Sequence, residues 1–525
     1  MSDNEPSDPD RVRTAEVIAS LSLATDMAMG LPLEHGLQST LIAMRLCDRL
    51  DVDSETASQT YFLSLLFYVG CNAPVDVGWE VFGDDSALTT YATPFRFGTR
   101  TEMAMGMMRA VAPPTSPAHV RVWRAARHLP VLALRFGGVV SATCEVARML
   151  TDELGLSTDV SRLFAYESER WDGKGMPDGV AEEAIPLAVR IAHVASDAAF
   201  QRMLGDSRFV TDVIANRAGG AFDPTVAAVF ARHGEEILHP GAEGSLWDRT
   251  LASEPKPWQM LEGDDIDRAL AAMGHFSDMG IPELIGHSAG VSKLCSKAAE
   301  LLSFDPADTA MTRRAASVHD LGRVAVPMRI WQKPGPLSMD DREQVRLHAY
   351  HTERVLTHSP LLATLVPAAG SHHERLDGSG YHRGAMASSL HPTARLLAAA
   401  DAYHAMTEPR PHRAAMSPGE AAEALRGAAR DGHFAADAVT AVLESSGHSF
   451  APVESPARLT DREIQVVRLL ARGLQTKQVA QALEISPKTA DFHIQNSYRK
   501  MGVSTRAGAT LFAMQHGLTT WENSW

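Results

Sequence analysis

Histidine and aspartate side chains gather in the middle of the sequence in a pattern suited to binding divalent metal ions. Imidazole nitrogens and carboxylate oxygens bind such ions, and a carboxylate next to a histidine can bridge two of them. A single histidine is more often an ordinary core or surface residue, and the chain has 22 of them. The candidate ligands are His287, His319, Asp320, His348, His372, His373 and Asp401.

The elements that must position these side chains are helices. Runs of alternating β-branched residues are scarce, while segments such as Leu284–Leu302 and Glu420–Arg430 repeat apolar residues at spacings of three and four. We therefore predict an all-α fold with the ligands scattered over several helices.

The order and spacing of the candidate ligands resemble the HD-GYP phosphodiesterases, a subgroup of the HD metal-dependent phosphohydrolases. The resemblance spans His287 to Arg413 and includes Val-His-Asp-Leu-Gly-Arg at 318–323, His-His-Glu-Arg-Leu-Asp-Gly-Ser-Gly-Tyr at 372–381 and Arg-Pro-His-Arg at 410–413. It implies that all seven candidates bind two divalent ions, Fe or Mn, with Asp320 as the bridge. The implied substrate is a cyclic dinucleotide such as cyclic di-GMP.

Two metal ions would supply the chemistry, because they lower the pKa of a bridging water and neutralise the phosphodiester oxygens. No serine or cysteine nucleophile is required. We assign catalytic roles to His319, Asp320 and Arg323. We assign phosphate binding, with surface ion pairs as the alternative for each arginine, to Arg375, Tyr381, Arg410 and Arg413.

Two departures from the family pattern bear on activity. Arg323 stands where the family has lysine, and Gly380-Tyr381-His382 replaces Gly-Tyr-Pro. Arginine keeps the positive charge but changes its reach and hydrogen-bond geometry. Turnover of a cyclic dinucleotide, hydrolysis of another nucleotide and pure nucleotide sensing all stay open.

An internal repeat indicates that the first half of the chain is a diverged copy of the second. The segments 167–175 and 372–380 align without a gap, and Arg190 then falls on Arg395. His35 matches His287, but the later ligand positions hold other residue types. Phe67 and Tyr68 stand for the His-Asp pair, Glu167 and Ser168 for the paired histidines, Ser196 for Asp401, and Thr143 lies near the position of His348.

Phenylalanine and tyrosine cannot hold a divalent cation in this geometry, so we expect metal only in the second copy. The first copy then either packs against the second or binds an input ligand.

A different kind of site is predicted at the C-terminal end, where Lys and Arg outnumber acidic residues. From Ala457 onward nine basic residues face five acidic ones, although the whole chain has a net charge of −15. Thr460-Asp-Arg-Glu463 is a capping box, Thr476 is a candidate N-cap, and Ser486-Pro487 starts a helix that should end near Met501. Short helices in this order could present a helix N-terminus to the major groove of DNA.

The segment resembles the LuxR-type helix-turn-helix. The resemblance rests on Leu-Thr-Asp-Arg-Glu-Ile at 459–464, Ile-Ser-Pro-Lys-Thr at 485–489 and Lys-Met-Gly-Val-Ser-Thr-Arg at 500–506. It implies four helices, binding to double-stranded DNA as a homodimer, and a dimer contact through about Ser504–His516. The DNA-contacting candidates are Lys477, Lys488, Thr489, Asp491, Phe492, His493, Gln495, Asn496, Arg499 and Lys500. Because Asp491 is acidic where the family often has lysine, we expect an altered sequence preference or weaker binding.

Length and composition set the domain plan. A chain of 525 residues should hold about three domains. We predict two tandem HD-type helical domains followed by a four-helix LuxR-type domain, with a disordered leader at 1–11, a degenerate HD-like domain at 12–250, an HD-GYP-like domain at 257–446, a linker at 447–456 and the helix-turn-helix domain at 457–525.

The preferred function is a cytoplasmic, membrane-independent transcriptional regulator whose metal site hydrolyses or senses a nucleotide. Four widely spaced cysteines fit a reduced compartment. The alternative is an active phosphohydrolase for another nucleotide, with the helix-turn-helix as a secondary targeting module.

Overall fold

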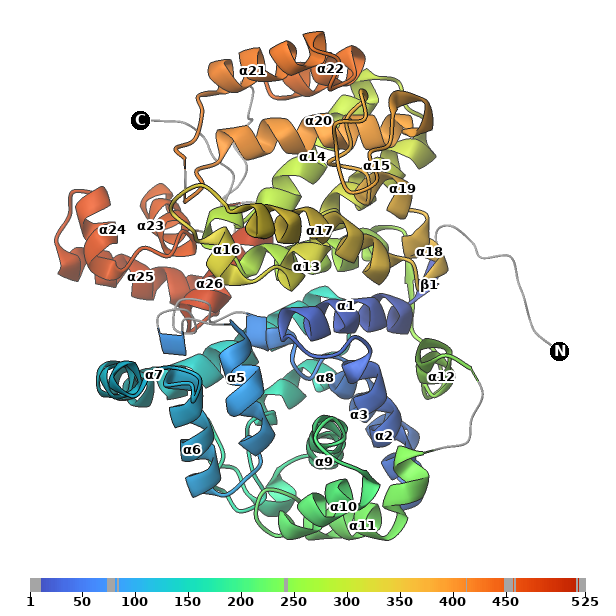
Figure 1. Cartoon of the computed structure of the whole chain (residues 1–525), viewed down its shortest axis with the longest axis vertical. Helices are drawn as coiled ribbons and strands as arrows, with labels where there is room; N and C mark the ends of the chain where they lie inside the picture. The colour runs from blue at the N-terminus through green and yellow to red at the C-terminus, as the bar shows by residue number, and fades with distance from the viewer. Residues whose placement is uncertain are drawn as a thin grey trace. The chain divides into compact units, whose positions relative to one another are not determined.

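The computed structural model describes residues 11–72, 81–82, 85–239, 244–411, 413–447, 457, 459–515 and 518. The expected leader lies outside these residues except for Arg11, which opens a short strand, and the expected linker lies outside them except for Gly447. The described chain is mainly helical, which confirms the predicted all-α fold (Figure 1). Its two strands, β1 (Arg11–Arg13) and β2 (Met260–Glu262), pair with each other.

Two compact units divide the chain, Arg13–Leu261 and the rest. The helices of the first unit are drawn from blue to green in Figure 1. They are α1 (Thr14–Ala28), α2 (His35–Leu50), α3 (Ser54–Leu65), η1 (Val69–Asn72), α5 (Asp85–Tyr91), η2 (Thr93–Phe95), α6 (Arg100–Val111), α7 (Ala118–Glu153), α8 (Thr158–Leu163), η3 (Phe164–Tyr166), η4 (Glu182–Ala184), α9 (Leu187–Gln201), α10 (Ser207–Asn216), α11 (Pro224–Leu238) and α12 (Leu246–Ala252).

The other unit contains the predicted metal ligands and the C-terminal helices, drawn from green to red in Figure 1. Its elements are α13 (Asp264–Met279), η5 (Pro282–Leu284), α14 (His287–Leu301), α15 (Pro306–Val318), η6 (Leu321–Ala325), α16 (Met328–Trp331), α17 (Met339–Leu356), α18 (Pro360–Ala363), α19 (Val366–Ala369), η7 (Ala387–Ser389), α20 (Pro392–Thr407), α21 (Pro418–Arg430), α22 (Ala436–Ser445), α23 (Asp461–Ala471), α24 (Thr476–Ala482), α25 (Pro487–Met501) and α26 (Arg506–Gln515).

The two copies share the device that starts the helix bearing the first histidine. α2 begins at His35 and α14 at His287, each after a residue with positive φ. The Asp26 carboxylate accepts the Gly36 amide at 3.1 Å, and the Asp278 carboxylate accepts the Ser288 amide at 2.8 Å. Because these bonds satisfy amides that a helix start leaves unpaired, they fix the position of the adjacent histidine.

The repeated loop is also built alike in both copies. Glu169 accepts the amides of Asp178 and Gly179, and Glu374 accepts those of Arg383 and Ala385. A Cβ on Gly175 or on Gly380 would lie 2.4 Å from the Cα of the loop glutamate in its copy. The repeated sequence therefore encodes a loop that supports the fold in both halves.

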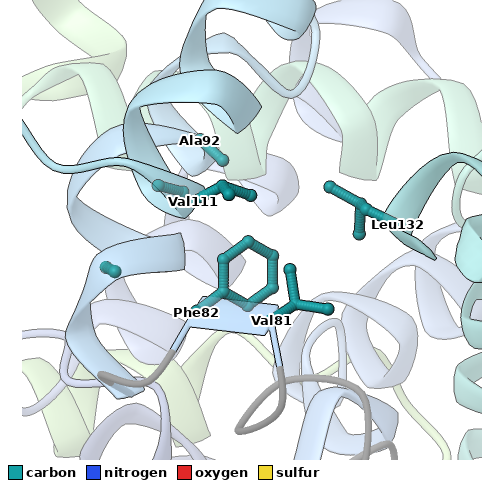
Figure 2. Packing of buried hydrophobic residues seen from close by; sticks show 7 residues of the cluster. Val81, Phe82, Ala92, Val111 and Leu132 are labelled. Atoms are coloured by element: carbon teal, nitrogen blue, oxygen red, sulfur yellow. The ribbon is translucent and has the colours of Figure 1, made fainter. Parts of the chain in front are cut away.

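A separate cluster of buried apolar side chains packs α5, α6 and α7 of the first unit together. Figure 2 shows the ring of Phe82 beside Val81 and below Val111, with Leu132 facing them from α7.

No single helix among the described residues could cross a membrane; only the pair Ala118–Leu132 and Leu134–Glu153, bent by 58°, fits by length and composition.

The C-terminal helices follow the predicted capping, with one correction. Thr460 and Glu463 form the capping box, and the Ser486 hydroxyl accepts the Thr489 amide at 3.1 Å before Pro487. The prediction that Thr476 caps the second helix is wrong. Thr476 is already helical, and the extended residue Gln475 is the cap, its amide donating to the Gln478 side chain at 2.7 Å.

Candidate metal centre

Helix ends and turns bring all seven predicted ligands together. His287 starts α14, the His319-Asp320 pair follows the end of α15, His348 lies on α17, the His372-His373 pair follows α19, and Asp401 lies on α20. Their ligand atoms form two groups, each with all such atoms within 4.8 Å of one another. One group is His287, His319, Asp320 and Asp401, and the other is Asp320, His348, His372 and His373.

Asp320 belongs to both groups and offers one carboxylate oxygen to each. Its Oδ2 lies 3.3 Å from His287 Nε2 and 2.9 Å from His319 Nε2. Its Oδ1 lies 3.3 Å from His348 Nε2 and 3.4 Å from His372 Nε2. A carboxylate between two sets of nitrogen donors has the arrangement that a bridge between two ions requires.

The donor atoms fit a metal because the protein leaves them unsatisfied. His287 Nε2, His319 Nε2, Asp320 Oδ1 and Asp401 Oδ1 are buried without a hydrogen-bond partner among the described residues, whereas Asp320 Oδ2 forms an ion pair with Arg323. Buried polar atoms without partners are costly, so such a cluster indicates an external ligand. Nitrogen and carboxylate oxygen donors of this kind suit a transition-metal ion.

Backbone carbonyls orient three of the histidines. His319 Nδ1 lies 2.8 Å from the Ala316 carbonyl, and His372 Nδ1 lies 2.6 Å from the Ala369 carbonyl. His348 Nδ1 makes the same contact with Val345. A carbonyl only accepts, so each Nδ1 has a proton and Nε2 is the nitrogen that faces the other ligands.

Burial and neighbouring charges set the ionisation of the centre. Burial alone would raise the pKa of Asp320, but Arg323 and His319 hold it well below its usual value. Burial lowers the pKa of His372 to about 4. Asp320 is therefore an anion and His372 a neutral imidazole at neutral pH, which are the forms that bind metals.

Arg323 and Tyr381 lie at the centre as well. Arg323 Nη2 is 2.6 Å from Asp320 Oδ2, while its Nε and Nη1 are buried without partners. The ring of Tyr381 stacks on His373 with centroids 4.6 Å apart. The unsatisfied guanidinium atoms give Arg323 donors for a phosphate oxygen.

The other predicted phosphate ligands make contacts within the protein. Arg375 stacks over Phe434 at 4.3 Å and donates to the Glu374 carbonyl. Arg410 Nη2 lies 2.9 Å from the Glu408 carboxylate. Arg413 donates to backbone carbonyls of the segment 405–414. Their phosphate roles stay predictions.

The first copy has other residue types at the matched positions. A Cβ on Gly322 would lie 2.1 Å from the His348 carbonyl, and a Cβ on Gly70 would lie 2.1 Å from the Thr143 carbonyl. This equivalence places Thr143 at the position of His348. The hydroxyl of Tyr68 bonds that of Ser196 at 2.8 Å, while the neighbouring Asp197 turns away to Arg217.

A guanidinium lies where the second copy gathers its ligands. Arg96 Nη2 is 2.8 Å from Glu167 Oε1 and 3.3 Å from the Ser168 hydroxyl, and its guanidinium carbon is 5.1 Å from the ring centre of Phe67. Burial alone would lower the pKa of Arg96, but Glu167 raises it. Sequence comparison of the copies missed Arg96, because it lies in the segment after η1 that has no counterpart in the repeat.

The predicted DNA-contacting side chains fall mainly on the exposed side of α25. Lys488, Asp491 and Phe492 are exposed, and so is Lys477 on α24. Lys500 differs, since its ammonium lies 2.6 Å from Glu463 of the capping box. The remaining candidates are Thr489, His493, Gln495, Asn496 and Arg499, of which Arg499 and Asn496 are joined by a 2.8 Å hydrogen bond.

Comparison with known families confirms both resemblances. Residues 139–226 and 278–437 match the HD domain family, and residues 457–513 match the bacterial regulatory proteins of the luxR family. Two segments of the chain thus match the HD domain family, and a C-terminal segment matches the luxR family.

Individual relatives are phosphodiesterases. The chain is 28% identical to 3'3'-cGAMP-specific phosphodiesterase 3 of Vibrio cholerae over 77% of this chain and 88% of that one. It is 31% identical to 3'3'-cGAMP-specific phosphodiesterase 1 of the same organism, over 34% of this chain and 41% of the relative. It is 32% identical to a cyclic di-GMP phosphodiesterase of Thermotoga maritima, over 27% of this chain and 39% of the relative.

A solved structure shares the fold. The crystal structure of a V. cholerae cyclic GMP-AMP specific phosphodiesterase, V-cGAP3, aligns with a TM-score of 0.55 at 22% identity and covers 83% of this chain and 98% of that one.

Proposed function

We propose that the second copy is a metal-dependent phosphodiesterase for cyclic dinucleotides and that the chain is a DNA-binding regulator that includes this site. The observation that carries the proposal is the pair of four-ligand groups sharing Asp320, in which His287 Nε2, His319 Nε2 and Asp401 Oδ1 are buried without a hydrogen-bond partner among the described residues. The names of the relatives favour 3'3'-cGAMP or cyclic di-GMP as the substrate.

Each side chain has a separate task in this proposal. The seven ligands hold two ions, iron or manganese, which when bound supply an activated water and neutralise charge on the phosphodiester. Arg323 donates from Nε and Nη1 to a phosphate oxygen. Tyr381, stacked on the ligand His373, is placed beside the ions and would contact the substrate phosphate.

The test is turnover of 3'3'-cGAMP and of cyclic di-GMP by the purified, manganese-loaded chain, compared with Asp320→Asn. We expect hydrolysis of at least one dinucleotide by the wild type and none by the variant. Metal binding without turnover would contradict the enzymatic proposal and favour a sensor, because His382 stands where the HD-GYP pattern has proline.

The luxR-type segment would read double-stranded DNA as a homodimer in the cytoplasm, through the exposed side of α25. We also propose that the state of the metal site alters DNA affinity, because both modules share one chain. The double change His319→Ala with Asp320→Ala should then shift the dissociation constant for DNA. An unchanged constant would end the coupling proposal and leave DNA binding itself intact.

A further inference from the structure

Glu408 is a buried carboxylate that stands behind the predicted metal ligands. Its side chain is 1% exposed, and its Oε2 lies 2.9 Å from His287 Nδ1. That nitrogen is on the side of the ring away from Nε2, which lies 3.3 Å from Asp320 and 3.2 Å from Asp401. His287 therefore lies between a carboxylate behind it and the metal-binding carboxylates in front.

His287 needs this partner more than the other histidines do. His319, His348 and His372 each use Nδ1 to donate to a backbone carbonyl three residues earlier. His287 is the first residue of α14, so no preceding helical turn offers it such a carbonyl. Glu408 takes the place of that acceptor from the chain after α20.

Two neighbours hold Glu408 in turn. His404 Nδ1 lies 3.1 Å from its Oε1, and Arg410 Nη2 lies 2.9 Å from its Oε2. The Arg410 guanidinium balances the buried negative charge, which would otherwise be costly. Each oxygen of Glu408 therefore has a nitrogen atom of a basic side chain beside it.

Gly290 makes the room that this arrangement requires. A Cβ at Gly290 would lie 1.9 Å from His404 Nε2 and 2.5 Å from His404 Cε1, although Gly290 has ordinary helical backbone. Glycine in a helix interior costs roughly 0.5–1 kcal/mol relative to alanine. The rings of His287 and His404 pack edge to face with centroids 5.3 Å apart. The glycine one turn after His287 thus admits His404, which braces Glu408.

We propose that Glu408 is a positioning residue for the metal centre. Its carboxylate accepts a hydrogen bond from His287 Nδ1 and thereby orients the Nε2 lone pair of His287 toward an ion. This inference rests on the proposed metal site. A carboxylate on the far nitrogen of a ligating histidine fixes its tautomer and orientation and makes it a stronger donor, and its loss weakens metal binding about 10–100-fold.

The experiment uses the full chain and compares Mn²⁺ affinity, by competition with a chelator, for wild type, Glu408→Gln and Glu254→Gln. The control removes a charge from another buried glutamate, which pairs with Arg13 in the first unit. We expect the Mn²⁺ dissociation constant to rise about 10–100-fold for Glu408→Gln and to stay unchanged for Glu254→Gln.

A second variant guards against loss of the fold in Glu408→Gln. Gly290→Ala adds only a methyl group that must displace His404, and alanine favours the helix. We expect a smaller rise in the dissociation constant with the helical circular dichroism retained. Unchanged affinity in both variants would overturn the inference while the metal site stands. A wild-type chain that binds no Mn²⁺ would overturn the proposed function together with the inference.

Discussion

The two copies of the HD scaffold differ in how their buried polar atoms are satisfied. In the second copy, His287 Nε2, His319 Nε2 and Asp401 Oδ1 are buried in the ligand cluster without hydrogen-bond partners among the described residues. In the first copy Arg96 forms an ion pair with Glu167 and Tyr68 bonds Ser196, while His35 Nε2 and Glu167 Oε2 are also buried without hydrogen-bond partners among the described residues. The matched positions thus gather predicted metal ligands in one copy and surround an internal guanidinium in the other.

The largest effect should come from removing the internal cation. Arg96→Met leaves the Glu167 carboxylate buried without its partner, and breaking a buried pair costs about 3–5 kcal/mol. We expect a loss of that size in the free energy of unfolding, measured with urea. The double change with Glu167→Gln should recover most of it. Equal stability of wild type and Arg96→Met would mean that the first copy does not depend on this cation.

In the second copy, loss of Arg323 should lower the phosphodiesterase activity. Arg323→Met removes Nε and Nη1, the donors left without partners beside Asp320. Loss of one such donor typically lowers kcat about 10²–10³-fold. The measurement is the rate of cyclic dinucleotide hydrolysis. The Mn²⁺ content of the variant is the control and should equal that of the wild type. Full activity in the variant would remove Arg323 from the site.

The pH dependence of stability tests the difference between the two copies at His35. His35 matches His287 in the second copy but lacks its acidic neighbours. Burial lowers the pKa of His35 to about 4. In the unfolded chain His35 is protonated below its ordinary pKa of 6.5, whereas in the folded chain it stays neutral down to about pH 4. The free energy of unfolding therefore decreases as the pH falls from 6.5 to about 4.

His35→Met should remove this part of the dependence. The loss between pH 7.5 and 5.5 should be about 1 kcal/mol smaller in the variant than in wild type, because one pKa unit corresponds to about 1.4 kcal/mol. Urea unfolding at the two pH values measures it. Parallel losses in both proteins would show that His35 does not titrate as described.

The smallest expected effect concerns lysines of the luxR-type segment. Lys488 is exposed on α25, whereas Lys500 pairs with Glu463. Lys488→Ala should weaken binding to DNA of any sequence and reduce the slope of log affinity against log salt by about 1. Lys500→Ala should mainly lower the stability of the segment. A reversed outcome, seen in binding titrations at several salt concentrations, would place the DNA on another surface.

The sequence predicted what depends on local pattern. The helical fold, the capping box at Thr460 and the start of α25 at Ser486-Pro487 follow from neighbouring residues, and the repeat located the matched ligand positions. Arg96 and Glu408 escaped prediction because their partners are distant in sequence, at Glu167 and His287. Thr476 was misassigned because its neighbour Gln475 can also cap a helix.

The central claim is that the second copy binds metal and the first does not. It is tested most directly by the metal content of the purified full chain, compared with the double variant His319→Ala with Asp320→Ala. We expect about two transition-metal ions per chain in the wild type, as in dinuclear sites, and essentially none in the variant. Ions retained by the variant, or a wild-type chain without any, would contradict the account.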